Sequence, residues 1–162
     1  MKAEVIQTAT VINSPHPRVS VIIPSYNYAH YLTEAVMSVL NQSYRDLEII
    51  IVDPISTDET PEVCRGLLEH FADKRLTVIR QENKGQPAIS RNLGIARARG
   101  KFVIPLDADD KLAPDMIKEC VELLENTKEV SIAYTDRLDF GDYEGIVQAG
   151  EYDFPRLRYA NH

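Results

Sequence analysis

The sequence has only two cysteines, Cys64 and Cys120, and no run that approaches the ~18 apolar residues of a membrane-spanning helix. The cysteines lie far apart and match no zinc spacing, so a disulfide framework and a structural zinc lose support. The first ten residues include polar side chains rather than the apolar block of a secretory signal. We therefore expect no transmembrane segment and a cytoplasmic location, either free or peripheral to the inner face of the membrane.

Glycine is also scarce, with seven residues and no Gly-x-Gly-x-x-Gly or Walker loop among them. This removes the main support for a dinucleotide-binding Rossmann enzyme and a P-loop NTPase, and it disfavours a metal-dependent nucleotidyltransferase. Positive charge is in deficit, because 18 Lys and Arg against 25 Asp and Glu give a net charge of −7. We expect no nucleic-acid partner, since such binding needs a basic face. A nucleotide ligand that is held together with a metal ion remains compatible with this negative net charge.

Short β-branched runs alternate with segments of helical period, which predicts an α/β fold with a mostly parallel sheet in a three-layer α/β/α arrangement. The predicted strands cover residues 19–23, 47–52, 76–79, 101–106 and 130–134. Pro105 favours an edge, a bulge or a strand end. We expect a flexible lead-in over residues 1–17, a ligand-binding domain over 18–136, and a hairpin or tail over 137–162.

Acidic residues follow the fourth predicted strand, at the edge where parallel α/β sheets bind ligands. Asp107, Asp109 and Asp110 repel one another, and two unit charges ~4 Å apart cost about 4 kcal/mol at an effective dielectric of ~20. Mg²⁺ or Mn²⁺ would relieve that repulsion, because hard cations prefer carboxylate oxygens. A solvated acidic turn that caps the next helix is the alternative, and the position of the cluster favours the metal.

Two further stretches lie at the same predicted edge. Tyr26, after the first strand, can stack on a nucleobase, or it can simply cover the edge of the sheet. Lys84 and Arg91, after the third strand, can pair with a diphosphate, or they can belong to a solvated helix face.

Seven motifs occur in an order that resembles the N-terminal donor-binding portion of inverting family 2 glycosyltransferases, which have the GT-A fold. They are Val19–Asn27, Ser38–Ser43, Asp46–Asp53, Ser56–Thr60, Asn83–Gly85, Ser90–Gly94 and the Asp-x-Asp (DXD) motif in Asp107–Asp110. The resemblance spans about residues 18–136. It implies a nucleotide-sugar-binding, Rossmann-like GT-A domain.

The resemblance implies sugar transfer from a nucleotide-diphospho-sugar, with a UDP-sugar first in order, to an acceptor hydroxyl with inversion and with Mn²⁺ or Mg²⁺ as cofactor. The implied donor-site residues are Pro24, Tyr26, Asn27, Asp53, Lys84, Arg91, Asn92, Asp107 and Ala108, with Asp109 holding the metal. A carbohydrate, a lipid-linked acceptor or a protein can supply the hydroxyl, and a homo-oligomer is compatible. The catalytic base is not assigned, although Asp139, Asp142 and Glu144 are candidates.

The sequence departs from the family after the second strand. The family usually has Asp-Asp-Gly-Ser there, and its second acid commonly reads the imide N–H of uracil, whereas this chain has Asp53-Pro54-Ile55-Ser56. Pro54 offers neither a carboxylate nor a backbone N–H. A β-branched residue such as Ile55 disfavours a left-handed turn. A non-catalytic GT-A-like domain, or a truncated fragment with impaired donor binding, is therefore the alternative function.

Overall fold

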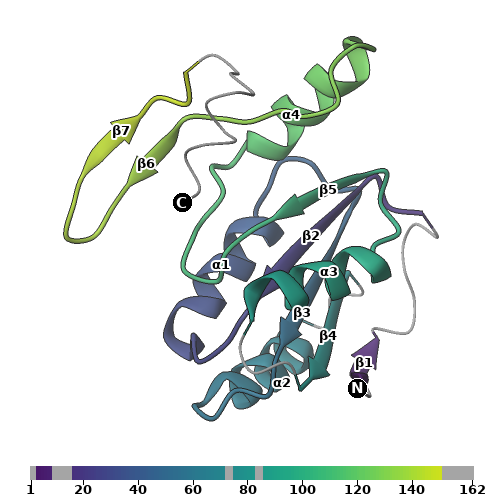
Figure 1. The fold of residues 1–162 in the computed structure, drawn as a ribbon, viewed down its shortest axis with the longest axis vertical. Coiled ribbons are helices and arrows are strands. Elements are labelled where there is room, and N and C mark those ends of the chain that lie inside the picture. Colours follow the sequence, from purple (N-terminus) through teal and green to yellow (C-terminus); the bar gives the residue numbers. More distant parts are fainter. Residues whose placement is uncertain (1–2, 9–15, 72–74, 83–85, 151–162) are drawn as a thin grey trace. The chain divides into compact units, whose positions relative to one another are not determined.

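A computed structural model of the chain describes residues 3–8, 16–71, 75–82 and 86–150 (Figure 1). It divides into two compact units, residues 1–118 and 119–162. The first unit contains a five-stranded sheet in the order β1-β4-β3-β2-β5. Its strands are β1 (Ala3–Thr8), β2 (Val19–Pro24), β3 (Leu47–Asp53), β4 (Leu76–Gln81) and β5 (Phe102–Pro105). Strands β2 to β5 are parallel, whereas β1 is antiparallel to β4.

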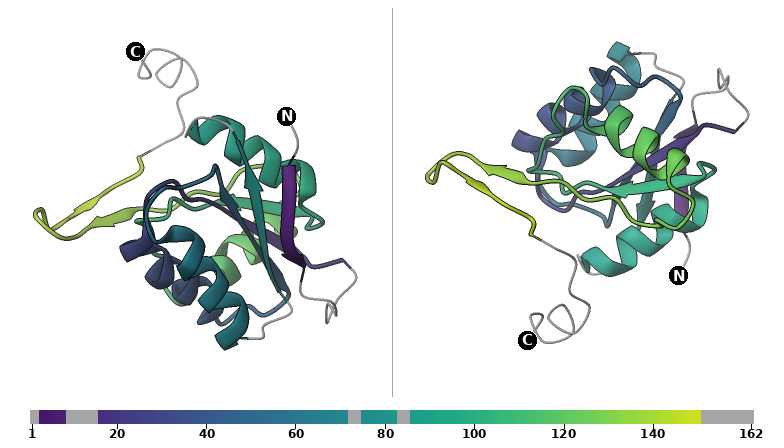
Figure 2. Two further views of the ribbon diagram at one scale, coloured as in Figure 1. Left: turned by 90° about the horizontal axis from the view of Figure 1, so that it is seen from below. Right: turned by 90° about the horizontal axis from the view of Figure 1, so that it is seen from above.

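Helices cover both faces of this sheet, which confirms the predicted three-layer α/β fold. Helices α1 (Ala29–Leu40) and α2 (Thr60–Phe71) lie side by side on one face, and α3 (Pro87–Arg97) lies on the other (Figure 2). Every residue of β3 is buried, as expected for a strand covered on both sides. Helix α3 packs closely on β2 because Gly94 has no side chain, and an added Cβ would lie 2.3 Å from Cγ2 of Ile22.

The second unit contains most of α4 (Met116–Asn126) and an antiparallel hairpin of β6 (Arg137–Asp139) and β7 (Gly145–Val147). The hairpin agrees with one of the two structures expected for residues 137–162. The strand predicted over residues 130–134 was wrong, because these residues have no sheet partner within the described part of the chain. Ile132 in this stretch is 69% exposed, so its apolar character does not reflect burial in a sheet.

The expectation of a flexible lead-in over residues 1–17 was wrong for Ala3–Thr8, which form β1. The strand pairs with the outer edge of β4, with an irregularity between Val5 and Gln7. Edge pairing uses backbone N–H and C=O groups, so the polar side chains of this segment do not prevent it. The division of the chain at residues 17 and 136 stays a prediction. No helix among the described residues has the length and apolar character needed to cross a membrane.

A polar cluster of the buried Ser20 and Glu48 with Arg99 and Gly100 joins the amino ends of β2, β3 and β5. The Glu48 side chain accepts hydrogen bonds from the Ser20 hydroxyl (2.6 Å) and from the Arg99 backbone N–H (2.8 Å). The Arg99 guanidinium also donates to Glu48, with its Nε 2.9 Å away. Gly100 donates its N–H to the Ser20 hydroxyl (2.9 Å). The cluster therefore fastens the turn between α3 and β5 to the sheet, at the end opposite the predicted ligand site.

Candidate functional site

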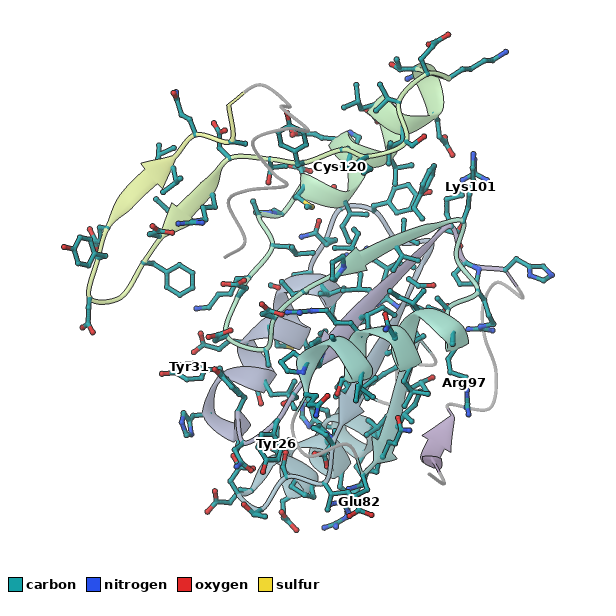
Figure 3. All side chains as sticks on the ribbon, viewed as in Figure 1. Tyr26, Tyr31, Glu82, Arg97, Lys101 and Cys120 are labelled. Atoms are coloured by element: carbon teal, nitrogen blue, oxygen red, sulfur yellow. The ribbon has the colours of Figure 1, made fainter. Side chains whose placement is uncertain are left out.

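The loops that follow β2, β3 and β5 leave the same edge of the sheet, as predicted. The backbone N–H of Ser25 donates to the Val52 carbonyl (2.9 Å), and that of Leu106 donates to the Ile22 carbonyl (2.9 Å). These bonds continue the strand pairing into the loops. Figure 3 shows Tyr26 at the end of the sheet toward which β3 and β4 run, with Lys101 at the opposite end.

The loops after β2 and β3 are interlocked through Ser56. Its hydroxyl accepts the N–H of Asn27 (3.0 Å) and donates to the Ser25 carbonyl (3.4 Å), so it bonds to both neighbours of Tyr26. In return, the Asn27 side-chain oxygen accepts the N–H of Thr57 (2.9 Å). Asn27 thus belongs to the edge as predicted, and its side-chain oxygen serves to join the two loops.

The turn after β3 has a left-handed residue that we did not expect. Ile55 has φ 61° and Asn27, in the facing loop, has φ 59°. The expectation that Ile55 would avoid this region was wrong. The hydrogen bonds of Ser56 and Thr57 to the facing loop hold the turn in place, against a steric cost of about 1–2 kcal/mol for a left-handed L-residue. The Ile55 side chain is 46% exposed.

Asp53 supports this turn from below and is fully buried. One carboxylate oxygen accepts the N–H of Ser56 (2.7 Å), and the other accepts Nε of Arg80 on β4 (2.9 Å). Sequence reasoning missed Arg80. The signal is its place directly opposite Asp53 in the parallel register of β3 and β4, which only the paired strands reveal. Pro24 ends β2 beside this network and is partly exposed.

Asp58 connects the same loop to the starts of α1 and α2. Its carboxylate accepts the backbone N–H groups of Ala29 (3.1 Å) and Thr60 (3.0 Å). Burial alone would raise the pKa of Asp58, but the hydrogen bonds from Thr60 and Ala29 outweigh it and lower the pKa below its usual value. Asp58 is therefore a structural carboxylate that stays ionised at neutral pH.

Cys64 lies on α2 beneath the same network and is not a catalytic nucleophile. Burial raises the pKa of its thiol to about 12, and the negative charge of Asp53 contributes to the rise. At neutral pH the side chain is an uncharged thiol, whereas the thiolate is the reactive form.

The DXD segment lies after β5, and its acids have different surroundings. Asp107 forms an ion pair with Arg91 of α3, and its carbonyl accepts the N–H of Asp110 (3.1 Å). Ala108 is buried, whereas Asp109 is exposed. Within the described residues, no three His, Cys, Asp or Glu side chains gather into a metal site. Asp109 alone cannot complete a coordination shell, but its carboxylate fits Mg²⁺ or Mn²⁺ if substrate phosphates supply further oxygens, as is usual for Mg²⁺.

The remaining predicted donor-site residues lie on or before α3. Asn92 follows Arg91 and is exposed. Lys84 lies outside the described residues. The turn after α1 holds the segment after the DXD motif. The buried side chain of Gln42 in this turn donates to the Ala113 carbonyl (2.7 Å) and accepts the N–H of Ile117 (3.1 Å). This anchor fixes where the DXD loop ends.

The Ser25 hydroxyl is a polar group of the site whose effect on the free energy of unfolding can be tested. Its hydroxyl is buried and has no hydrogen-bond partner among the described residues, whereas the equally buried Ser20 hydroxyl has two. An unsatisfied buried polar group costs about 1–3 kcal/mol. We expect Ser25→Ala to raise the free energy of unfolding by about 1 kcal/mol and Ser20→Ala to lower it by about 1–2 kcal/mol, as measured by urea denaturation. Equal losses in both variants would show that Ser25 is satisfied.

Comparison with known sequences and structures gives a consistent result. The profile of the family described as Glycosyl transferase family 2 matches residues 20–158. The chain is 34% identical over 127 residues to the glycosyltransferase GlyG of Streptococcus pneumoniae, with 78% of the chain and 41% of GlyG covered. It is 37% identical over 155 residues to the chondroitin synthase of Escherichia coli, with 95% of the chain and 22% of the synthase covered. The chain thus spans less than half the length of these relatives.

Two solved structures are similar in fold and sequence. One is S. aureus TarS 1-349 in complex with UDP-GlcNAc, with 32% identity, a TM-score of 0.61, and 67% of the chain and 31% of TarS covered. The other is the mannosyltransferase PcManGT from Pyrobaculum calidifontis in complex with GDP-Man and Mn²⁺, with 31% identity, a TM-score of 0.63, and 76% and 36% covered. Relatives of similar identity therefore hold donors with different bases.

Proposed function

The chain belongs to glycosyl transferase family 2, and from this premise we infer that its loops at the carboxyl edge bind the nucleotide-diphospho-sugar donor of a sugar transfer. The observation that carries the proposal is the interlocking of these loops. Hydrogen bonds through Ser56 and Asn27 join the loops after β2 and β3, and the Arg91–Asp107 ion pair joins α3 to the loop after β5. The edge is therefore preorganised without a ligand, as binding sites for small molecules usually are.

We assign the donor-binding roles by position at this edge. Pro24 and Tyr26 line the nucleoside site, and Tyr26, which is 40% exposed, stacks on the base. Asp53 and Asn27 hold the loops of the site in place, because their side chains accept hydrogen bonds from the loop after β3. Arg91 and Asn92 face the diphosphate, while Asp107 and Ala108 lie beside the ribose or the sugar. Lys84 lies outside the described residues, and its assignment to the diphosphate rests on the sequence resemblance alone. Asp109 holds Mn²⁺ or Mg²⁺. A UDP-sugar is the first donor to test, since a solved relative holds UDP-GlcNAc.

The proposed reaction is transfer with inversion. An acceptor hydroxyl attacks the anomeric carbon, the bond from that carbon to the diphosphate breaks, and a base removes the proton of the hydroxyl. A bound divalent cation supplies Lewis-acid stabilisation of the departing nucleoside diphosphate. The acceptor and the base are not assigned, and neither Asp139, Asp142 nor Glu144 is chosen. A cytoplasmic location and a homo-oligomer stay predictions.

The non-catalytic alternative rests on Pro54 and Ile55, which depart from the usual Asp-Asp-Gly-Ser turn. The comparisons do not favour it, because the relatives that they return are glycosyltransferases and synthases. The turn also has a left-handed conformation at Ile55, which a glycine adopts without strain. This backbone shape supports a donor site at this edge.

Ligand binding to the folded chain tests the proposal. UDP with Mn²⁺ is expected to raise the melting temperature, because a ligand at 100 times its Kd stabilises the folded state by about 2.7 kcal/mol. Differential scanning fluorimetry with UDP, CDP, GDP and ADP, each with and without Mn²⁺, is the measurement. No rise with any of these nucleotides would overturn the proposal. UDP-GlcNAc hydrolysis, followed by UDP release, provides a second readout.

A further inference from the structure

The turn after β3 points to an unusual way of binding the base. We propose that Ile55 and Tyr26 bind the nucleobase through apolar contacts and that no carboxylate forms a hydrogen bond with the edge of the base. The site then binds uridine and cytidine diphosphates with similar affinity. The inference rests on the proposed donor site and names the groups that recognise the base.

The Ser56 hydroxyl joins the two loops that carry these side chains. This hydroxyl bonds to the backbone of Ser25 and of Asn27, the residues on either side of Tyr26. Ile55 directly precedes Ser56. Tyr26 is 40% exposed and Ile55 is 46% exposed, so both present apolar surface at the carboxyl edge. An aromatic ring and a branched aliphatic side chain, held on two interlocked loops, form the walls of a site for a flat ring.

The conformation of Ile55 supports a contact with a ligand. It lies at φ 61°, where a β-branched residue is an outlier. A glycine would adopt this conformation without strain. Nearly half of the isoleucine side chain is open to solvent, so burial in the core does not account for its presence there. Strained residues of this kind cluster at ligand-binding sites, and contact with a base gives the side chain a role.

The acids of the same loop are already engaged. Both oxygens of Asp53 accept hydrogen bonds inside the protein, from Ser56 and Arg80, and its side chain is fully buried. Both oxygens of Asp58 accept backbone N–H groups, from Thr60 and Ala29.

Three further positions near this loop bear on whether a carboxylate can reach the base. Pro54 occupies the position of the acid that commonly reads the imide N–H of uracil, and it offers no carboxylate. Glu59 lies beyond Asp58, directly before α2, and is exposed to solvent. Glu82 follows β4, on the far side of β3 from the loop that holds Tyr26. Within the described residues of these loops, the carboxylates of Asp53 and Asp58 are therefore already engaged, and the position that commonly reads the imide N–H has none.

The lack of a carboxylate for the base predicts how the site discriminates between uracil and cytosine, because these two pyrimidines differ in their hydrogen-bonding groups. Uracil presents an imide N–H donor, whereas cytosine presents a ring-nitrogen acceptor and an amino group at the same edge. A carboxylate opposite the ring nitrogen favours uracil, because it accepts the imide N–H there and would face the lone pair of cytosine. Contacts to the faces of the ring do not distinguish the two bases, because both rings have nearly the same size and shape.

Isothermal titration calorimetry with UDP and with CDP, both in the presence of Mn²⁺, tests the inference. We expect the two Kd values to agree within about three-fold. Ile55→Ala should weaken both ligands by about five-fold, through lost apolar contact. Ile95→Ala is the matched control, because Ile95 is 48% exposed near the end of α3 and should leave both Kd values unchanged. The double variant Pro54→Asp with Ile55→Gly should shift the ratio toward UDP by about ten-fold.

Each outcome is decisive. A preference of the unaltered chain for UDP over CDP by about ten-fold or more would overturn the inference and leave the proposed function standing. Unchanged Kd values in Ile55→Ala would do the same, provided that its melting temperature shows a folded protein. Binding of neither nucleotide by the unaltered chain would overturn this inference, and the proposed donor site would be overturned with it if GDP and ADP also failed to bind.

Discussion

Replacing Asp109 with alanine is expected to abolish the Mn²⁺-dependent part of the stabilisation by UDP and to weaken UDP binding in Mn²⁺ at least ten-fold. The side chain is exposed at the carboxyl edge, whereas Asp107 already pairs with Arg91. Asp109 is therefore the acid best placed to share a cation with a diphosphate, and its removal leaves the negative charges of that group without their counterion. Calorimetry with and without Mn²⁺ measures both effects.

Asp115→Ala is the control for this experiment. Asp115 is exposed, lies in the same unit and carries the same charge, so its loss changes the net charge equally. UDP should bind this variant as it binds the unaltered chain. Retention of the full Mn²⁺ effect in Asp109→Ala would show that residues other than Asp109 hold the metal. The melting temperature of the unliganded variants should be nearly equal, since exposed substitutions usually change stability by less than about 0.5 kcal/mol.

Glu48→Ala should lower the free energy of unfolding by about 3 kcal/mol, more than any other substitution proposed for this chain. Glu48 is buried and accepts hydrogen bonds from the Ser20 hydroxyl and from the backbone and guanidinium of Arg99. Truncation leaves these donors without their acceptor. The Arg99 side chain is 34% exposed, so solvent partly compensates, and the loss falls toward the lower end of the range for a broken buried pair. Urea denaturation followed by circular dichroism is the measurement.

Glu62→Ala is the matched control, because Glu62 also faces an arginine. Its carboxylate lies 3.9 Å from Arg65, but both side chains are more than half exposed. An exposed pair of this kind contributes about 0.2–1 kcal/mol, so the variant should unfold close to the unaltered chain. A similar loss in both variants would contradict the view that burial makes Glu48 important. Glu48→Gln, which keeps the hydrogen-bond acceptor, should lose less than Glu48→Ala.

The sequence was most informative where the signal is local. Short β-branched runs predicted β2, β3, β4 and β5, and Pro105 lies on the edge strand as its missing N–H suggested. A parallel sheet then requires that the loops after these strands share one edge. This is why Tyr26, Asp53 and Asp107 could be expected at the same edge before any coordinates were known.

Partners that are far apart in the chain were not predictable. Arg80 meets Asp53, and Arg99 meets Glu48, only once strands and helices are packed. The conformation of Ile55 was missed for a related reason. Local sterics disfavour a left-handed isoleucine, but hydrogen bonds from a loop some thirty residues away in sequence outweigh them. The apolar residues at 130–134 led to the prediction of a strand that the structure does not contain. An apolar run becomes a strand only if a neighbouring strand pairs with it.

The short antiparallel strand β1 has a practical consequence. It covers the outer edge of β4, which would otherwise present a row of unpaired amide and carbonyl groups. An expression clone that begins at residue 16, chosen to trim the residues before the first motif, would uncover that edge while leaving the nucleotide loops intact. Such a clone is expected to self-associate as its concentration rises, so the first eight residues should be retained in any preparation meant for crystallisation.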